Sequence, residues 1–243
     1  MSLFTTIKKS IPNTLTCMSL FCGCFAVVCA MNLLFFYAMC FIFVGAVFDF
    51  SDGFAARLLN ATSPIGKELD SLADQVTFGV APGFVVYFWT ASNFGGSLLP
   101  CIAFLITAFS ALRLAKFNVD ERQTSSFIGL ATPANAIFFS SLIAANTSND
   151  MYGFLKESPW YMVTLVVGFS LLLTSELPMF SFKFKHGGFK GNEDKFILIG
   201  FAVLAMLSTL FMENVKVYSV IPVIILFYIV VCLFELLKSK KKA

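Results

Sequence analysis

The sequence predicts an all-α membrane protein, a polytopic bundle of about eight transmembrane helices with both termini in the cytoplasm. Three observations lead to this prediction. Hydrophobic residues make up 58% of the 243 residues and charged residues only 13%, whereas about a quarter of a soluble domain is charged. Apolar stretches of roughly 18 residues or more follow one another along the chain. Lys and Arg are also concentrated in alternate connecting segments.

The apolar stretches give the expected order of helices. The first stretch continues without an A-x-A-like cleavage site, so it is expected to be a span rather than a signal peptide. The sequence shows no internal repeat and no soluble second domain, so residues 1–243 are expected to form one domain. The expected spans cover about 12–31, 33–57, 70–92, 97–117, 130–147, 158–175, 195–212 and 217–237.

The cationic residues orient these spans. Lys and Arg collect on the cytoplasmic side of membrane proteins. With the N-terminus inside and eight spans, fifteen of the seventeen cationic residues fall on that side, and only Lys156 and Lys216 fall outside. A different number of spans would scramble this division.

Four aspartates, Asp49, Asp52, Asp70 and Asp74, lie where the second and third spans meet. The first two are three residues apart and the last two are four apart, spacings that put each pair on one helix face. A short turn joins the two helices, so the pairs can face each other. Clustered carboxylates at a membrane boundary need a compensating positive charge and indicate function. Oxygen ligands without nearby His or Cys favour Mg²⁺ or Mn²⁺, with Ca²⁺ also suitable, over Zn²⁺.

The residues around the aspartates suit a phosphorylated ligand. Gly53 allows close approach to the backbone, Ala56 keeps the helix face open, and Arg57 is placed for a phosphate. Ser63 can donate a hydrogen bond from the connecting turn, and Gly66 continues the small face. An isolated aspartate pair at a helix end is more often a cap, but four at these spacings are not explained in that way.

These residues match the signature of the CDP-alcohol phosphatidyltransferases, D-x2-D-G-x2-A-R-x8-G-x3-D-x3-D, at all eight fixed positions between Asp49 and Asp74. The resemblance implies that the four aspartates hold two metal ions, and that Asp74 is also the general base. It implies that Gly53, Arg57 and Ser63 hold the CDP-lipid and that the protein is a homodimer.

Further stretches, at 11–23, 66–83, 110–118 and 129–136, resemble the phosphatidylserine synthases of this family. Ala131 and Asn135 depart from that pattern, in a region that can touch the acceptor. In the family the region of Asn13 and Thr16 lines the nucleotide pocket, although an N-terminal helix cap after Pro12 explains these residues equally well.

The expected acceptor, L-serine, needs a cation for its carboxylate and an acceptor for its ammonium group. Arg113 and Lys116 share a helix face on the side of the aspartates, and Asn118 and Arg122 follow them. We expect these four residues to bind serine. Topology anchors are the alternative for the cations, and a helix C-cap is the alternative for Asn118.

The expected reaction is direct transfer of the phosphatidyl group from CDP-diacylglycerol to L-serine, giving phosphatidylserine and CMP. Glycerol 3-phosphate or an inositol phosphate is the alternative acceptor, and a cation transporter is a remote alternative, although its carboxylates would lie nearer the bilayer midplane. The protein is expected in a bacterial or archaeal cytoplasmic membrane, with its active site on the cytoplasmic side. No nucleic acid is expected as a partner.

Overall fold

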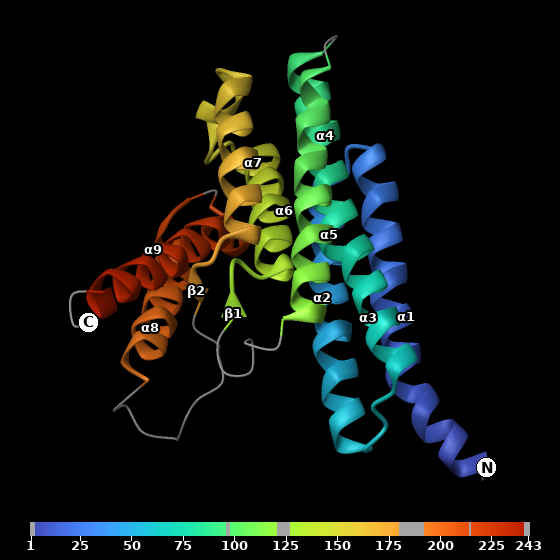
Figure 1. Ribbon diagram of the computed structural model, residues 1–243. Helices are drawn as coiled ribbons and strands as arrows, with labels where there is room; N and C mark the ends of the chain where they lie inside the picture. The colour runs from blue at the N-terminus through green and yellow to red at the C-terminus, as the bar shows by residue number, and fades with distance from the viewer. Residues whose placement is uncertain (1–2, 96–97, 121–126, 180–191, 214, 241–243) are drawn as a thin grey trace.

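The computed structural model describes residues 3–95, 98–120, 127–179, 192–213 and 215–240, which are almost entirely helical (Figure 1). The α-helices in these ranges are α1 Leu3–Met31, α2 Phe35–Leu58, α3 Pro64–Asp74, α4 Ala81–Phe94, α5 Phe104–Val119, α6 Thr132–Asn149, α7 Pro159–Thr174, α8 Glu193–Ser208 and α9 Ile221–Lys240.

Ser-Pro pairs begin two of these helices. Ser63 caps α3 by accepting a hydrogen bond on its hydroxyl oxygen from the Gly66 backbone N–H at 3.1 Å. Ser158 caps α7 in the same way, accepting from Trp160 N–H at 3.4 Å. A proline follows each cap, where its missing N–H has no partner to lose. The Ser63 cap therefore fixes the start of α3, the helix that carries the second pair of aspartates.

The third expected span is one continuous helical run from residue 64 to residue 94. It contains α3, a π-helix at Gln75–Val80 and α4. Neighbouring α5 supports the π-helix, because Gln75 Nε2 donates to Thr107 O and Thr107 Oγ1 donates to Gly79 O, both at 3.0 Å. Such π turns are frequent at functional sites. This one starts directly after Asp74.

Close contact between α1, α2 and the π-helix fixes their relative positions. A Cβ on Gly23 would lie 2.8 Å from Thr77 Cα, and one on Gly45 would lie 2.6 Å from Thr77 Cγ2. Thr77 Oγ1 donates to Ser19 O at 2.9 Å, and Ser19 Oγ donates to Gly45 O at 3.0 Å. Small residues thus let the three backbones approach and exchange hydrogen bonds.

The helices have the composition of a membrane protein. Within the described residues, five helical segments are long and apolar enough to cross a bilayer, namely Ser10–Met31, Phe35–Leu58, Leu99–Val119, Asp194–Phe211 and Val217–Lys238. A shorter apolar helix covers Pro159–Thr174. The chain is therefore a helical integral membrane protein.

The most buried helix, α6, is not among these five candidates. It packs against α2, α4 and α9, and its Phe138 and Phe139 both contact Phe169 of α7. Because α6 lies inside the bundle, it can carry hydroxyl and amide side chains that lower its hydropathy. All eight expected spans overlap helices, but eight crossings are not established.

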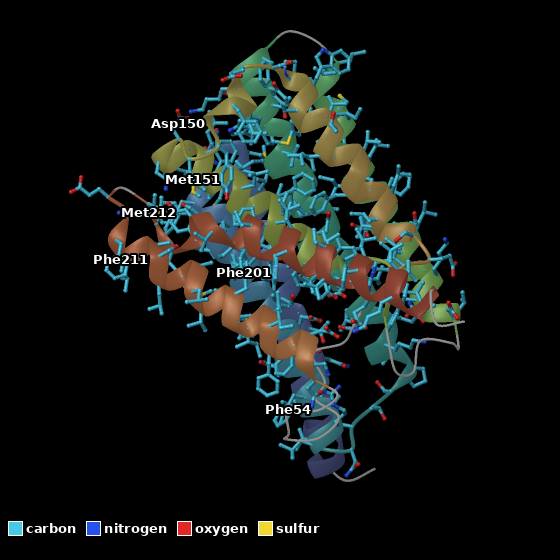
Figure 2. All side chains as sticks on the ribbon, turned by 90° about the vertical axis from the view of Figure 1, so that its left-hand side faces the viewer. Phe54, Asp150, Met151, Phe201, Phe211 and Met212 are labelled. Carbon is cyan, nitrogen blue, oxygen red and sulfur yellow. The ribbon has the colours of Figure 1, made fainter. Side chains whose placement is uncertain are left out.

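The last two helices differ in direction from the others. Helices α1–α7 run roughly alongside one another, whereas α9 crosses the bundle obliquely and α8 is inclined as well (Figures 1 and 2). The face seen in Figure 2 exposes large apolar side chains, including Phe54, Phe211 and Met212. On an integral membrane protein, exposed apolar side chains of this kind suit contact with lipid or with another apolar helix surface.

The structure also contains a short β-ribbon, which the all-α prediction did not include. Strand β1 (Phe127–Ile128) pairs antiparallel with β2 (Pro178–Met179). Gly129 N–H donates to Leu177 O at 2.9 Å, and Leu130 N–H donates to Leu172 O at 3.0 Å. The segment before α6 is thereby held against the end of α7.

Candidate active site

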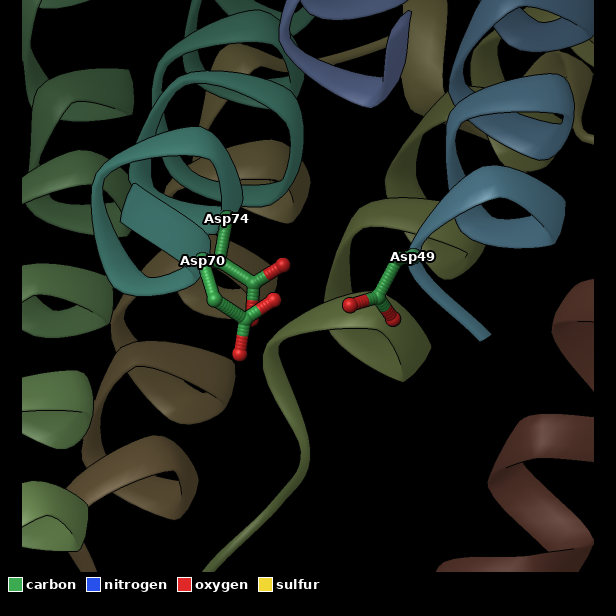
Figure 3. Close-up of side chains that lie close together, drawn as sticks. All are labelled: Asp49, Asp70 and Asp74. Atoms are coloured by element: carbon green, nitrogen blue, oxygen red, sulfur yellow. The ribbon is translucent and has the colours of Figure 1, made fainter. Parts of the chain in front are cut away.

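Three of the four aspartates form one group, the aspartate cluster, made of Asp49 on α2 with Asp70 and Asp74 on α3. One carboxylate oxygen from each lies within 4.8 Å of the others, and all three side chains are partly buried. Figure 3 shows the carboxyl groups directed into the same space from the two helices. The carboxyl groups of Asp49 and Asp74 lie within hydrogen-bonding reach of each other.

Asp52 lies beside the aspartate cluster but outside its tightest part. Its side chain is only 6% exposed, and Thr16 Oγ1 of α1 donates to its Oδ2 at 2.6 Å. It interacts electrostatically with Asp49 and Asp70. The four predicted ligands therefore lie near one another between the C-terminal halves of α2 and α3, with Asp52 turned toward α1.

The aspartate cluster fits a divalent metal. Its donors are carboxylate oxygens, which Mg²⁺ and Mn²⁺ prefer. Three negative groups this close repel one another strongly in partly buried surroundings unless a cation or a proton lies among them. The donor set and its convergence thus favour a metal site, while the identity and number of the ions stay predictions.

A cavity of about 200 Å³, the Asp52 cavity, adjoins this group. Six of the seven residues predicted to bind the CDP-lipid line it. These are Asn13, Thr16, Gly53, Ala56, Ser63 and Gly66. Asp52 and Asp70 complete the wall on the metal side, so the cavity opens onto the carboxylates.

Small residues keep this cavity open. A Cβ on Gly66 would lie 3.0 Å from Ser63 Oγ and 3.2 Å from Asn13 Oδ1, so a larger residue would crowd both polar atoms. Arg57, the seventh predicted residue, is exposed and does not line the cavity. Its Nη1 lies 3.5 Å from the position of a Gly53 Cβ. The guanidinium group is therefore beside the cavity wall.

Arg113 connects the aspartate cluster to a second cavity. It is only 7% exposed, interacts electrostatically with Asp74, and places its Cζ 5.6 Å from the centroid of the Phe117 ring. Its Nε has no hydrogen-bond partner within the described part of the chain. A buried guanidinium group whose Nε donor is unused among the described residues, next to a predicted general base, is suited to an anionic substrate group.

The second cavity, the Arg113 cavity, has a volume of about 350 Å³. Arg113 and Lys116 of α5 line one side, and the end of α7 with Ser175 and Glu176 lines another. Lys116 Nζ donates to Thr174 O at 3.3 Å across the cavity. Two of the four residues predicted to bind serine therefore share a cavity.

The other two serine-binding predictions have different outcomes. Asn118 does not line the Arg113 cavity. Its Nδ2 donates to Ser71 Oγ at 2.8 Å, and its carbonyl oxygen accepts from Lys67 Nζ at 3.2 Å, which joins α5 to α3. Arg122 lies outside the described residues. The serine-binding roles of Asn118 and Arg122 both stay predictions.

Ala131 and Asn135, the departures from the phosphatidylserine synthase pattern, lie at the start of α6. Ala131 is the N-cap residue of the helix. Asn135 is fully buried, and both amide atoms lack a hydrogen-bond partner among the described residues. Because α6 packs on α2 and on the π-helix, this polar group lies close to the elements that carry the aspartates.

Several lining residues were not predicted from the sequence. Thr62 and Lys67 line the Asp52 cavity, and Asp120 and Glu176 line the Arg113 cavity. A sequence signal existed for Glu176, which directly follows an apolar span on the side where Arg113 lies. Its proximity to Arg113 depends on the packing of α5 against α7 and on the β-ribbon, which no short motif announces.

Comparisons with known proteins identify the class of protein that has this site. A family model described as CDP-alcohol phosphatidyltransferase matches residues 9–181. The chain belongs to the CDP-alcohol phosphatidyltransferase family.

Curated relatives carry a more specific name, CDP-diacylglycerol–serine O-phosphatidyltransferase. The protein of that name from Helicobacter pylori (strain ATCC 700392 / 26695) is 33% identical over 220 residues, covering 89% of this chain and 88% of the relative. The Bacillus subtilis (strain 168) protein is 40% identical over 126 residues, 51% of this chain and 69% of the relative. The Methanocaldococcus jannaschii protein is 37% identical over 117 residues, 47% and 55% of the two chains. The chain is thus similar to bacterial and archaeal proteins with this name.

Proposed function

We propose that this protein transfers the phosphatidyl group of CDP-diacylglycerol to the hydroxyl group of L-serine, giving phosphatidylserine and CMP. The observation that carries the proposal is the connection of the aspartate cluster to two different cavities. Asp70 also lines the Asp52 cavity, and Asp74 interacts with Arg113 of the Arg113 cavity. A donor site and an acceptor site on either side of one acidic centre fit a transfer between two substrates. The names of the curated relatives support serine as the acceptor.

In this proposal the nucleotide end of CDP-diacylglycerol occupies the Asp52 cavity, with Asn13, Thr16 and Ser63 as polar contacts. Arg57, beside Gly53, neutralises phosphate charge from the rim. Ala56, Gly53 and Gly66 leave room for the ligand. The acyl chains stay in the bilayer, next to the apolar surface of the helices.

The residues of the chain perform a direct displacement. The Asp74 carboxylate accepts the proton of the serine hydroxyl, and the hydroxyl oxygen forms a bond to the phosphorus that bears diacylglycerol. The bond from that phosphorus to the CMP oxygen breaks, and CMP leaves with the electron pair. Two divalent ions, Mg²⁺ or Mn²⁺, with Ca²⁺ also suitable, would be held by Asp49, Asp52, Asp70 and Asp74 and would neutralise the pyrophosphate charge.

The charges of the Arg113 cavity favour serine over the alternative acceptors. Glycerol 3-phosphate and inositol phosphates are dianionic, and carboxylates in the wall repel a dianion. The cavity holds Asp120 and Glu176 together with its two cations, Arg113 and Lys116. That balance fits a zwitterion better than a phosphate ester.

The proposal also includes the membrane arrangement. Eight crossings with both termini cytoplasmic would put the aspartates at the cytoplasmic face of a bacterial or archaeal cytoplasmic membrane, where serine and CMP are soluble. We further propose one domain over residues 1–243 and a homodimer, as the family resemblance implies. Light scattering of the purified protein, corrected for bound detergent, measures the number of chains.

An acceptor screen tests the reaction. Purified protein with CDP-diacylglycerol and Mg²⁺ or Mn²⁺ is given serine, glycerol 3-phosphate, an inositol phosphate or no acceptor, and CMP release is followed. CMP release should depend on serine and on the metal and should yield phosphatidylserine by mass spectrometry. Turnover with a phosphate ester but not with serine would replace the proposed acceptor.

A further inference from the structure

The Arg113 cavity has two oppositely charged parts. Arg113 and Lys116 are one helical turn apart on α5 and supply positive charge. Across the cavity lie the last residue of α7, Thr174, and the segment Ser175–Glu176. The two cations suit the carboxylate of the acceptor, so its ammonium group needs a partner of opposite charge elsewhere in the cavity.

The end of α7 is suited to an ammonium group. Carbonyl groups at a helix C-terminus carry partial negative charge and favour cations. Lys116 Nζ, itself an ammonium group, already donates to Thr174 O at 3.3 Å. The carboxylate of Glu176, two residues further along, adds a full negative charge to the same wall of the cavity.

The backbone on either side of Glu176 is held in place. Leu172 O accepts from Leu130 N–H at 3.0 Å, and Leu177 O accepts from Gly129 N–H at 2.9 Å. Pro178 and Met179 then pair with β1. Glu176 therefore projects from a short connection that is fixed at both ends, as a selective contact requires.

Asp120 is the competing carboxylate. It directly follows α5, and its backbone N–H donates to Lys116 O at 3.0 Å. Asp120 has extended backbone angles as the C-cap residue of α5, so it leaves the helix axis directly after the turn that carries Lys116. Asp120 therefore extends the wall that α5 forms with Arg113 and Lys116, whereas Glu176 lies on the wall formed by the end of α7.

We infer that Glu176, just beyond the C-terminal end of α7, binds the ammonium group of the acceptor and makes the site selective for a zwitterionic hydroxy amino acid. Arg113 and Lys116 hold the carboxylate of the same molecule. This inference rests on the proposed function and adds a specificity-determining residue to it. Glu176 contacts the acceptor and takes no part in proton transfer.

Steady-state kinetics of Glu176→Gln test the assignment. The KM for L-serine should rise roughly three- to tenfold, a modest factor because Glu176 is exposed and solvent screens its charge. The KM for CDP-diacylglycerol and the kcat at saturating serine should stay within about twofold. Glu176→Asp, which keeps the charge, should recover part of the serine affinity. Glu157→Gln, at the opposite end of α7, is the matched control and should behave like the wild type.

An acceptor analogue separates ammonium binding from other effects. 3-Hydroxypropanoate keeps the hydroxyl and the carboxylate of serine but has no ammonium group. Its inhibition constant against serine, or its KM if it is an acceptor, should not rise in Glu176→Gln. An equal loss for serine and 3-hydroxypropanoate, or an unchanged serine KM, would overturn the assignment. A larger effect of Asp120→Asn than of Glu176→Gln would also overturn it, because the ammonium site would then be at Asp120.

These outcomes differ from failure of the proposed function. If the wild type releases CMP with a phosphate ester and not with serine, the serine reaction itself is wrong. If the wild type uses serine and Glu176→Gln matches it, only the role of Glu176 is wrong.

Discussion

Individual residues of the proposed site have different surroundings, and their proposed roles differ accordingly. Asp52 is held by Thr16 in the wall of the Asp52 cavity, whereas Asp74 lies in the aspartate cluster within electrostatic reach of Arg113. The motif spacing predicted that the two aspartate pairs face each other, and the structure brings carboxylate oxygens of the three residues of the aspartate cluster within 4.8 Å of one another, with Asp52 beside them. It could not predict that Asp52 turns toward α1, because that orientation depends on a hydrogen bond between residues 36 positions apart.

Replacing Asp74 by Asn separates chemistry from binding. The change is nearly isosteric and removes the proposed base while leaving Asp49, Asp52 and Asp70 for metal. CMP release should fall to well below a tenth of the wild-type rate, with CDP-diacylglycerol affinity within a few-fold. Asp49→Asn should instead weaken metal and lipid binding together. Asp150→Asn, in an exposed ion pair with Lys156, is the control and should keep full activity. Substantial turnover by Asp74→Asn would assign the base elsewhere.

Removing the Arg113 side chain should affect serine more than CDP-diacylglycerol. A charge-assisted contact to a carboxylate contributes about 1.5–3 kcal/mol. Arg113→Ala should therefore raise the KM for serine roughly ten- to a hundredfold, with Arg113→Lys in between. Ethanolamine lacks the carboxylate, so any reaction with it should not depend on Arg113. Equal losses with both acceptors would place Arg113 on the phosphate side of the site.

At the scale of helices, the aspartates depend on the packing of α1 and α2 against the π-helix. Apolar length predicted where these helices lie along the chain, and each expected span overlaps a helix. The π-helix at Gln75–Val80 was not predicted, because it interrupts an apolar run that also suits a regular α-helix. Its cause is tertiary, through the contacts of Gln75 and Thr107 and the small residues facing Thr77.

Adding one methyl group at Gly23 tests this packing. The new Cβ would lie 2.7 Å from Thr77 Oγ1 and 2.8 Å from its Cα, so backbone must move. Gly23→Ala should lower stability by about 1–3 kcal/mol, seen as a lower melting temperature in detergent, and should reduce activity by displacing the helix that carries Asp74. Gly168→Ala is the matched control, since no atom lies within 4 Å of its new Cβ. That variant should be as stable as the wild type or slightly more stable. Similar melting temperatures for the two variants would contradict the tight packing.

For the whole molecule, hydropathy and charge predicted the class of fold but not its full shape. The helical membrane protein is confirmed, while the single-domain boundary and the span count stay predictions. In Figure 1 the α2–α3 connection, the end of α5 and the start of α6 lie at one end of the bundle, opposite the α6–α7 connection. That arrangement agrees with the sides of the membrane expected for the connections between helices α1–α7. The oblique course of α9 was not predicted, because hydropathy reports the length of an apolar helix and not its tilt.

The connection between α8 and α9 tests the span count. With eight crossings, Lys216 lies outside and the C-terminus inside, which leaves fifteen of the seventeen cationic residues on the cytoplasmic side. If the inclined α8 and α9 entered the bilayer without crossing it, the C-terminus would still be inside, but Lys216 would be inside too. A C-terminal reporter alone therefore cannot separate six crossings from eight.

A cysteine at position 216, in a chain whose native cysteines are replaced, should react with a membrane-impermeant maleimide added to intact cells. A cysteine at position 156, in the α6–α7 connection, is the positive control, and a reporter after Ala243 should read as cytoplasmic. Protection of position 216 with labelling of position 156 would reduce the bundle to six crossings, with the aspartates still on the cytoplasmic side. An external reporter after Ala243 would contradict both arrangements and the proposed orientation.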